Sequence, residues 1–406
     1  MNNKARKFFA VIILVLLLII SSTNYYGIKG IDNLAYVVAI GLDVGEKDTL
    51  NLSLQISMPT TTEGGSSSSQ SSSAVVDSIE CSSITSGISL FNSFLGKEVT
   101  LSHCKVLVIS EELAEKGVSE YLYTLSNNIE FRTDSNIIIS KCDARTFLEY
   151  STPLLDKISA RYYDIAPSSS EYTGYTESIT CNEFLTSISS KYSEPSAILG
   201  SINISSTQKT STNSSYTAGE TPISGEEPSV ETMGLAVFNK DELVGELNGL
   251  ESICHLTISN KLKNAQIRIP SPIKSLDYID LYIELDKNTK NSVLLVNGSP
   301  YITSNIYING KMQSMNDNVD LEDESLVAHI EQYAQNYIKQ SMYNYLYKTS
   351  KELHADIDNF GLYALKYFYN TSDWNEYNWL NRYKDSFFEV NVDFNLRSSY
   401  LLVNTK

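Results

Sequence analysis

Apolar and polar residues alternate along several stretches of the chain, and this alternation predicts β-strands with one buried face. The pattern is clear over residues 50–58, 279–285 and 388–396. Successive side chains of a strand point to opposite faces of a sheet, so every second residue can be buried. A continuous apolar run at 34–42, ending before Asp43, predicts a further strand that forms a hairpin with 50–58.

Apolar residues at helical spacing predict helices between these strands. Such spacing begins at Ile84, Leu113 and Ala144, and short strands are predicted between the helices at 105–109 and 136–140. A long amphipathic helix is predicted from about Glu322 to Glu352. Its expected inner face consists of Leu326, Ile330, Tyr333, Tyr337, Tyr345 and Leu346. Interleaved strands and helices predict a mixed α/β fold.

Two stretches of low complexity divide the chain. Residues 60–73 contain no apolar side chain, and 205–229 are rich in Ser and Thr. We interpret both as loops or linkers. The stretch that follows, 234–247, predicts a hairpin around Asn239, Lys240, Asp241 and Glu242. At 406 residues we expect two or three domains. The predicted division is an anchor at 1–26, an N-terminal domain at 27–200, a linker at 201–230, a middle-domain hairpin at 231–269 and a C-terminal domain at 270–406.

The N-terminus combines a basic tip with an apolar run, which is typical of an exported or membrane-anchored protein. Lys4, Arg6 and Lys7 precede thirteen apolar residues, 8–20. A thirteen-residue helix rises about 20 Å, short of the ~30 Å hydrocarbon core. Extending it to Tyr25 and Tyr26 gives about 28 Å. Serines and threonines after the run make a poor cleavage site, so we favour an uncleaved anchor, with cleavage as the alternative.

Composition narrows the classes of partner. The formal net charge is −17, and without the three basic residues of the tip 28 cationic side chains face 48 acidic ones, a balance of −20. Such a surface is repelled by phosphate backbones and by anionic lipid headgroups. The five cysteines are widely spaced, with no CxxC pair, so we expect mostly buried thiols rather than disulfides or a zinc site.

No familiar catalytic motif occurs in the chain. The sequence has no G-x-S-x-G, P-loop, G-x-G-x-x-G or H-E-x-x-H pattern and four histidines, His103, His255, His329 and His354. His103 adjoins Cys104, but neighbouring strand residues point to opposite faces, so a nucleophile pair is not expected. His329 and Glu331 are two apart on a helix and do not face each other.

Two other groups have structural interpretations that we prefer. Glu322, Asp323 and Glu324 stand where a helix begins, and carboxylates there interact with its positive end. The aromatic residues between Tyr333 and Trp379 form either a binding face or, as we favour, an aromatic core. We therefore nominate no catalytic, cofactor-binding or metal residue, and we expect no cofactor and no enzyme activity.

Four ordered motifs resemble the Ger(x)C family, the C subunits of nutrient germinant receptors in endospore-forming bacteria. The first is Ile31, Asp32, Asn33, Leu34, Ala35, Val37, Gly41, Leu42 and Asp43. The second is Ser102, His103, Lys105, Leu107, Val108, Ile109, Glu111, Glu112, Leu113, Ala114 and Gly117. The third is Gly234, Ala236, Val237, Phe238, Asp241, Leu243, Val244, Gly245, Leu247 and Glu251. The fourth is Lys351, Glu352, Leu353, Ala355, Asp356, Ile357, Phe360 and Gly361, followed by Trp374.

The resemblance implies three mixed α/β domains on the outer face of the spore inner membrane. It implies partnership with an A subunit and a polytopic B subunit, germination in response to nutrients, and no enzymatic activity. The motif residues look like a fold signature rather than a ligand site. The chain departs from the family at the lipid-attachment cysteine, which is expected near Tyr25 and is missing. The glycine that often follows the family's last strand is missing too.

The leading hypothesis is therefore a non-catalytic, membrane-anchored subunit of a germinant-receptor complex. A free-standing envelope protein that binds a small nutrient is the alternative, with direct ligand binding left open. An extracellular hydrolase is the third, and it needs a nucleophile or metal cluster that the sequence does not display.

Overall fold

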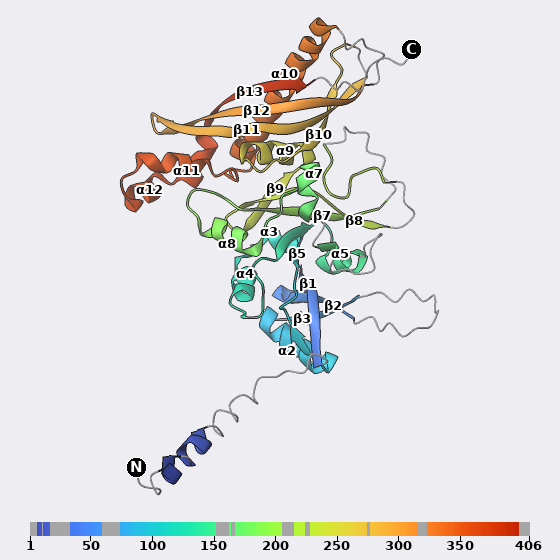
Figure 1. The fold of residues 1–406 in the computed structure, drawn as a ribbon, viewed down its shortest axis with the longest axis vertical. Helices are drawn as coiled ribbons and strands as arrows, with labels where there is room; N and C mark the ends of the chain where they lie inside the picture. The colour runs from blue at the N-terminus through green and yellow to red at the C-terminus, as the bar shows by residue number, and fades with distance from the viewer. Residues whose placement is uncertain are drawn as a thin grey trace.

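The described strands form two sheets, and helices cover both (Figure 1). The computed structural model describes residues 6–9, 11–16, 33–58, 74–151, 162–163, 167–204, 215–223, 228–273, 277–315 and 323–397. The first sheet contains nine strands and the second contains four. Figure 1 shows the four-stranded sheet toward one end of the molecule, strands β1–β3 toward the other, and helix α9 between them. The predicted mixed α/β fold is confirmed.

The nine-stranded sheet has a parallel centre and antiparallel flanks. Its order is β3-β2-β1-β5-β6-β7-β8-β9, with β4 paired beside the start of β1. Strands β1, β5, β6 and β7 are parallel neighbours, and the flanking strands are antiparallel. The bounds are β1 Leu34–Val44, β2 Leu50–Ser57, β3 Ala74–Cys81, β4 Glu98–Thr100, β5 Val106–Ser110, β6 Asn136–Ser140, β7 Ser196–Asn203, β8 Ser229–Asn239 and β9 Glu242–Leu247.

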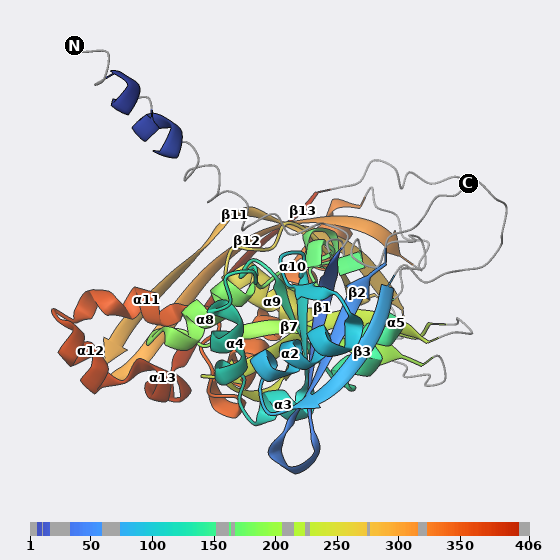
Figure 2. The same cartoon turned by 90° about the horizontal axis from the view of Figure 1, so that it is seen from below.

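Helices bury both faces of this sheet, which explains its apolar central strands. Val106 and Val108 of β5 pack on the side of α5, while Leu107 and Ile109 pack on the side of α2, α4 and α8. Figure 2, from below, shows α2, α3, α4 and α8 gathered near these strands. The bounds are α2 Ile84–Leu95, α3 Glu111–Glu115, α4 Ser119–Ser126, α5 Ala144–Tyr150, α7 Ser170–Thr173 and α8 Cys181–Ser189, with a 3-10 turn η2 at Glu46–Asp48.

The four-stranded sheet is built around one long hairpin. Its order is β10-β11-β12-β13, and β13 runs parallel to β12. The hairpin turns at Asn297 and Gly298, both with positive φ, as a two-residue turn of this type requires. The bounds are β10 Ala265–Pro270, β11 Tyr278–Val296, β12 Ser299–Met315 and β13 Phe387–Arg397. Helices α9 (Gly249–Ile258) and α10 (Glu324–Tyr347) share one core with this sheet.

The segment between α10 and β13 carries a chain of aromatic rings. The rings of Phe368, Trp374, Trp379 and Tyr383 each contact the next, and Tyr383 also contacts Phe388 at the start of β13. Of the predicted aromatic group between Tyr333 and Trp379, both tryptophans are buried, so the core interpretation is confirmed for them. Other members are exposed, namely Tyr347, Tyr363, Tyr367 and Tyr369, so it is wrong for these. The elements here are a π-helical turn η3 Lys348–Glu352, α11 Phe360–Ala364, η4 Leu365–Tyr367, α12 Thr371–Tyr377, α13 Trp379–Arg382 and η5 Tyr383–Asp385.

Strand β8 separates the two cores and so joins the two parts of the molecule. Ala236 and Phe238 pack into the core of the first sheet. Leu235 and Val237, on the other face of the same strand, pack into the core shared by α9 and the second sheet. The predicted hairpin at 234–247 is confirmed as β8 and β9, and it extends the first sheet. The predicted domain limits stay a prediction.

Several predicted elements differ from those in the structure. The strand expected at 279–285 is the first part of a longer strand, β11, whose irregular register near Leu285, Lys287 and Lys290 interrupts the alternation. The long helix was expected to reach Glu352 but is α-helical to Tyr347 and ends in the π-helical turn. Strands β3, β7 and β10 and helices α8, α9, α12 and α13 were not predicted.

Parts of the predicted anchor fall outside the described residues, as does the Ser-rich stretch 60–73. Residues 6–9 and 11–16 are helical, and their apolar side chains, such as Phe8 and Leu14, are exposed. Within the ranges that the structure describes, no helix combines the length and apolarity needed to cross a membrane. The anchor stays a prediction.

Two glycines with positive φ test how tightly β8 is packed. A Cβ on Gly234 would lie 2.2 Å from the carbonyl oxygen of Leu247, whereas a Cβ on Gly298 would meet nothing within 4 Å. We expect Gly298→Ala to cost about 1 kcal/mol, from its backbone conformation, and Gly234→Ala at least about 2 kcal/mol more, from overpacking. Urea unfolding of the two variants measures the difference. Equal losses would contradict the tight packing of β8 on β9.

Candidate functional site

A buried cluster of ionisable side chains joins the segment before α8 to helix α9 and to the loop after α10. His255 lies on α9 and is 1% exposed. Its Nε2 lies 2.8 Å from Oε2 of Glu177, and its Nδ1 lies 2.8 Å from Oδ1 of Asp358. The hydroxyl of Tyr345, on α10, donates to Oδ2 of Asp358 at 2.9 Å. We call Glu177, His255, Tyr345 and Asp358 the seam cluster.

The electrostatics of the seam cluster favour a protonated His255. Burial alone would lower the pKa of His255, but hydrogen bonds and charges from Asp358 and Glu177 outweigh burial and raise it to about 9. Burial alone would likewise raise the pKa of Glu177. The imidazolium and the Lys261 ammonium prevail, and they lower that pKa to about 2. Both ring nitrogens therefore donate to carboxylates.

Lys261 completes the charge balance. Its ammonium pairs with Oε1 of Glu177, and its side chain is half exposed. Two cations, His255 and Lys261, thus face two carboxylates, Glu177 and Asp358. A buried cluster of this kind is tolerated when every charge is paired and hydrogen-bonded. Removal of one member leaves the others buried and uncompensated.

The loop that carries Asp358 is fixed by a second buried carboxylate. Asp356 accepts hydrogen bonds from the backbone N–H groups of Phe360 and Gly361 and from the indole Nε1 of Trp379, at 3.1, 2.9 and 2.8 Å. Burial and the nearby Asp358 raise the pKa of Asp356 to about 7, against these three donors. The backbone oxygen of Asp356 also accepts from the N–H of Glu194. The loop is thereby tied to the strand β7 region.

A groove opens on the surface beside this loop. It consists of two adjoining hollows, of about 650 and 510 Å³, both of which are lined by Ser189, Ser190, Lys191 and Trp374. The first hollow continues along Leu185, Thr186, Tyr192, Leu365 and Thr371. The second continues along Ser119, Tyr123, Ile188, Lys240, Asp241, Asn375, Asn378, Trp379 and Leu380. Trp379 thus connects the groove to Asp356 and the seam cluster.

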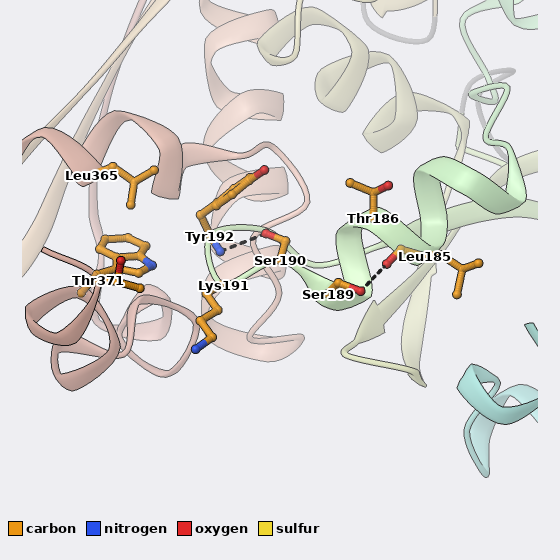
Figure 3. A pocket seen from close by; sticks show the side chains of 9 residues that line it. Leu185, Thr186, Ser189, Ser190, Lys191, Tyr192, Leu365 and Thr371 are labelled. Carbon is orange, nitrogen blue, oxygen red and sulfur yellow. Dashed lines mark hydrogen bonds between the residues drawn. The ribbon is translucent and has the colours of Figure 1, made fainter. Parts of the chain in front are cut away.

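Figure 3 shows how the first hollow is bounded. The end of α8 with Thr186 and Ser189 forms one side, and the segment with Leu365 and Thr371 forms the other. Lys191 extends from the connection between them, and its Nζ lies 2.9 Å from Oδ1 of Asn375. Hydroxyls of Ser189 and Ser190 bond to backbone atoms of Leu185 and Tyr192, so they fix the connection itself.

The two residue pairs considered above for catalysis or metal binding do not form such sites in the structure. Cys104 is buried with its thiol toward the carbonyl of Val106, while His103 is exposed beside Ser102 and the ring of Tyr36. His329 is exposed, and the carboxylate of Glu331 accepts from the backbone N–H of Leu396. Within the described part of the chain, no group of three or more His, Cys, Asp or Glu side chains is arranged to hold a metal ion.

The remaining predictions about side chains are partly confirmed. Asp323 caps α10 through the N–H of Ser325, and Glu324 lies in the first turn, whereas Glu322 is outside the described residues. Four of the five cysteines are buried and Cys142 is partly buried, and all are free thiols.

The motif residues hold the fold together where they can be followed. Asp43, at the end of β1, accepts from the backbone N–H groups of Ala144 and Arg145 and so caps α5. Asp241, in the β8–β9 turn, accepts from Ser119 of α4. A Cβ on Gly117 would lie 3.2 Å from Oδ2 of Asp241, so the second and third motifs meet there. Asp356 of the fourth motif closes its own loop. These contacts support their interpretation as a fold signature.

The seam cluster was missed because its partners are far apart in sequence. Glu177 and Asp358 carry no local pattern, and α9 was not predicted. One signal was present, since His255 lies between Cys254 and Leu256 in an apolar run. A histidine in such surroundings indicates burial and hence a partner. The groove was not predicted either, although its Lys240 was placed in the correct turn.

Two family models match the chain in tandem. The N-terminal domain of spore germination proteins matches residues 28–204, and the C-terminal domain described as spore germination B3/GerAC like matches residues 233–400. Glu177 and Lys191 lie in the first matched segment. His255, Lys240 and Asp358 lie in the second. The seam cluster and the groove therefore both join one matched segment to the other.

Two proteins of Bacillus subtilis and one crystal structure are similar to this chain. The chain is 25% identical over 338 residues to "Spore germination protein KC" of Bacillus subtilis, covering 82% of this chain and 81% of that protein. It is also 25% identical over 128 residues to "Putative spore germination protein YfkR" of the same species, covering 30% and 33% of the two chains. The crystal structure of the GerBC protein aligns with a TM-score of 0.47 at 13% identity, over 88% of this chain and 96% of the other.

The seam cluster predicts a defined pH dependence of stability. The raised pKa of His255, about 9 against 6.5, stabilises the fold below pH 6.5, and this contribution is lost as pH rises through 9. The lowered pKa of Glu177, about 2 against 4.5, stabilises the fold above pH 4.5, and this contribution is lost as pH falls through 2. Both contributions are complete between pH 4.5 and 6.5.

We expect His255→Gln to lower the free energy of unfolding by about 3–5 kcal/mol at pH 5.5, because it removes the imidazolium that the buried carboxylates of Asp358 and Glu177 share. At pH 10 the loss should be much smaller, since the wild-type imidazole is then neutral. Urea unfolding at the two pH values measures the change. The exposed His329→Gln is the matched control and should lose less than about 0.5 kcal/mol. A loss for His255→Gln that did not vary with pH would contradict the charged form.

Proposed function

The chain belongs to the GerAC-like family of spore germination proteins, and on that premise we propose that it is a non-catalytic subunit of a membrane germinant-receptor complex. The observation that carries the proposal is the tandem match over residues 28–204 and 233–400. The similarity to a germination protein over 81% of that protein's length supports a role for the whole chain, not for one borrowed domain.

The described structure supports a role in assembly. The seam cluster is buried and paired within the protein, so its hydrogen-bonding capacity serves the fold. The accessible feature beside it is an open groove rather than an enclosed pocket with converging acids and bases. A subunit that transmits a signal by contact needs surfaces of this kind.

We infer further that the complex contains the A and B membrane subunits of such receptors and responds to nutrients. The N-terminal segment would tether the chain, and the bulk would lie on the outer face of the spore inner membrane. The basic tip with its apolar run supports this orientation. The strongly acidic remainder supports a body held away from anionic lipid.

Deletion of the gene tests the role in germination. Spores without it should respond slowly, or not at all, to at least one nutrient, because a receptor lacking a subunit does not signal. Loss of optical density after addition of single nutrients measures the response, and the wild-type gene returned in trans should restore it. Normal germination with every nutrient tested would refute the receptor role. Saturable nutrient binding to the isolated chain by calorimetry would favour the solute-binding alternative.

The tether is tested on the mature protein. Mass spectrometry of the chain extracted from spore membranes should find Met1–Ile20 intact, because the residues after the apolar run form a poor cleavage site. Replacing residues 8–20 by a polar linker should release the chain from the membrane fraction. A mature N-terminus near Asn24 would show cleavage instead and would exclude this segment as the anchor.

A further inference from the structure

We propose that the groove between α8 and α12–α13 binds a carboxylate-rich peptide segment of a partner protein. The groove consists of the two adjoining hollows described above, which share the lining residues Ser189, Ser190, Lys191 and Trp374. If the proposed function is correct, the partner is another receptor subunit, and only this identification rests on the proposed function. The test of the peptide site measures peptide binding and does not involve germination.

The dimensions of the groove suit a stretch of chain. Each hollow, at about 650 and 510 Å³, is in the size range of a ligand site. The two hollows adjoin through four shared residues and lie open on the surface, so they form a trough rather than a closed cavity. An open trough covers little of a small molecule, whereas an extended peptide can follow its length.

The charge of the groove is opposite to that of the chain. Its charged lining side chains are Lys191, Lys240 and Asp241, in a protein of net charge −17. Asp241 accepts from the hydroxyl and the N–H of Ser119, which hold its carboxylate in place but do not neutralise it, so the lining has one net positive charge. Among the described carboxylates, none forms an ion pair with Lys191 or Lys240. The carboxylate of Glu194 interacts electrostatically with Lys240, whereas Lys191 bonds to a neutral amide. A net positive lining on an acidic protein favours an anionic segment.

The ammonium of Lys191 and the backbone of Lys240 are held in place before any partner arrives. The Lys191 ammonium is positioned by the neutral amide oxygen of Asn375, which leaves its charge unpaired. The backbone of Lys240 has φ +57°, a conformation uncommon for a residue other than glycine, and its N–H donates to the carboxylate of Glu194 at 2.6 Å. Lys240 lies in the turn between β8 and β9, and a tight hairpin turn accounts for its positive φ.

Neutral polar side chains complete the trough. Thr371 and Asn378 are exposed along its α12–α13 side and can bond to the backbone of an extended segment. A short peptide presents its carboxylates to the groove alone, whereas nucleic acid and anionic lipid surfaces extend over the acidic remainder of the protein, which repels them. The carboxylates of the peptide form ion pairs with the lysines, and its backbone forms hydrogen bonds with the neutral polar side chains.

Fluorescein-labelled hexaglutamate is the probe, added to the full-length protein in detergent. We expect saturable binding by fluorescence anisotropy at about 50 mM salt and strong weakening at about 500 mM. The double variant Lys191→Glu, Lys240→Glu should bind at least about tenfold more weakly, because each reversal replaces an attraction with a repulsion. Lys290→Glu, an exposed lysine on β11 outside the groove, is the matched control and should stay within about twofold.

Three results would overturn the proposal. The first is that hexaglutamate shows no saturable binding. The second is that the double variant and the control bind the probe equally well. The third is that free glutamate at the same carboxylate concentration displaces the probe. The last would indicate a site for a small carboxylate. Because both lysines are exposed, unfolding curves should match the wild type. If the probe binds but the deletion strain germinates normally, only the receptor role is refuted. If the probe does not bind but the deletion strain germinates poorly, only the peptide site in the groove is refuted.

Discussion

The pairing of His255 with two buried carboxylates is the constraint on which the arrangement of this protein depends. Its partners come from segments that are distant in sequence, Glu177 before α8 and Asp358 after α10. Hydrophobic packing lets surfaces slide, but a buried charge has few geometries in which it is fully satisfied. The cluster therefore selects one arrangement of the two parts among the many that apolar contact alone would tolerate.

The groove follows from the same constraint. Asp358 sits in a loop whose shape is set by Asp356, and Asp356 also holds the indole of Trp379, which lines the groove. Gly361 permits this close approach, since a Cβ there would lie 2.4 Å from the carbonyl oxygen of Tyr192. The walls of the groove are thus positioned by buried contacts, although the groove itself is at the surface. A change in either part would reach the other through this loop.

Sequence patterns predicted elements that have two unlike faces and missed those that do not. The alternation at 388–396 and the helical spacing from Leu326 onward gave β13 and α10 almost in full. Helix α9 was missed because nearly all its side chains are buried, so it has no polar stripe to reveal the period. Irregular pairing near Lys287 hid the continuity of β11. The seam cluster could not be predicted because its order in space is set by tertiary packing, and no spacing along the chain encodes it.

The pairing of β7 with β8 has a consequence for how this protein can be divided. The first matched segment ends just after β7, and the second begins inside β8, yet these strands are hydrogen-bonded neighbours in one sheet. A cut between them would turn β7, with its buried Ala197, Ile198 and Leu199, into an open edge of the kind that recruits foreign strands. It would also separate Glu177 from His255. The boundary between the two matched segments therefore falls between paired strands and not at an edge of the sheet, and either segment produced alone would carry a strand without its partner.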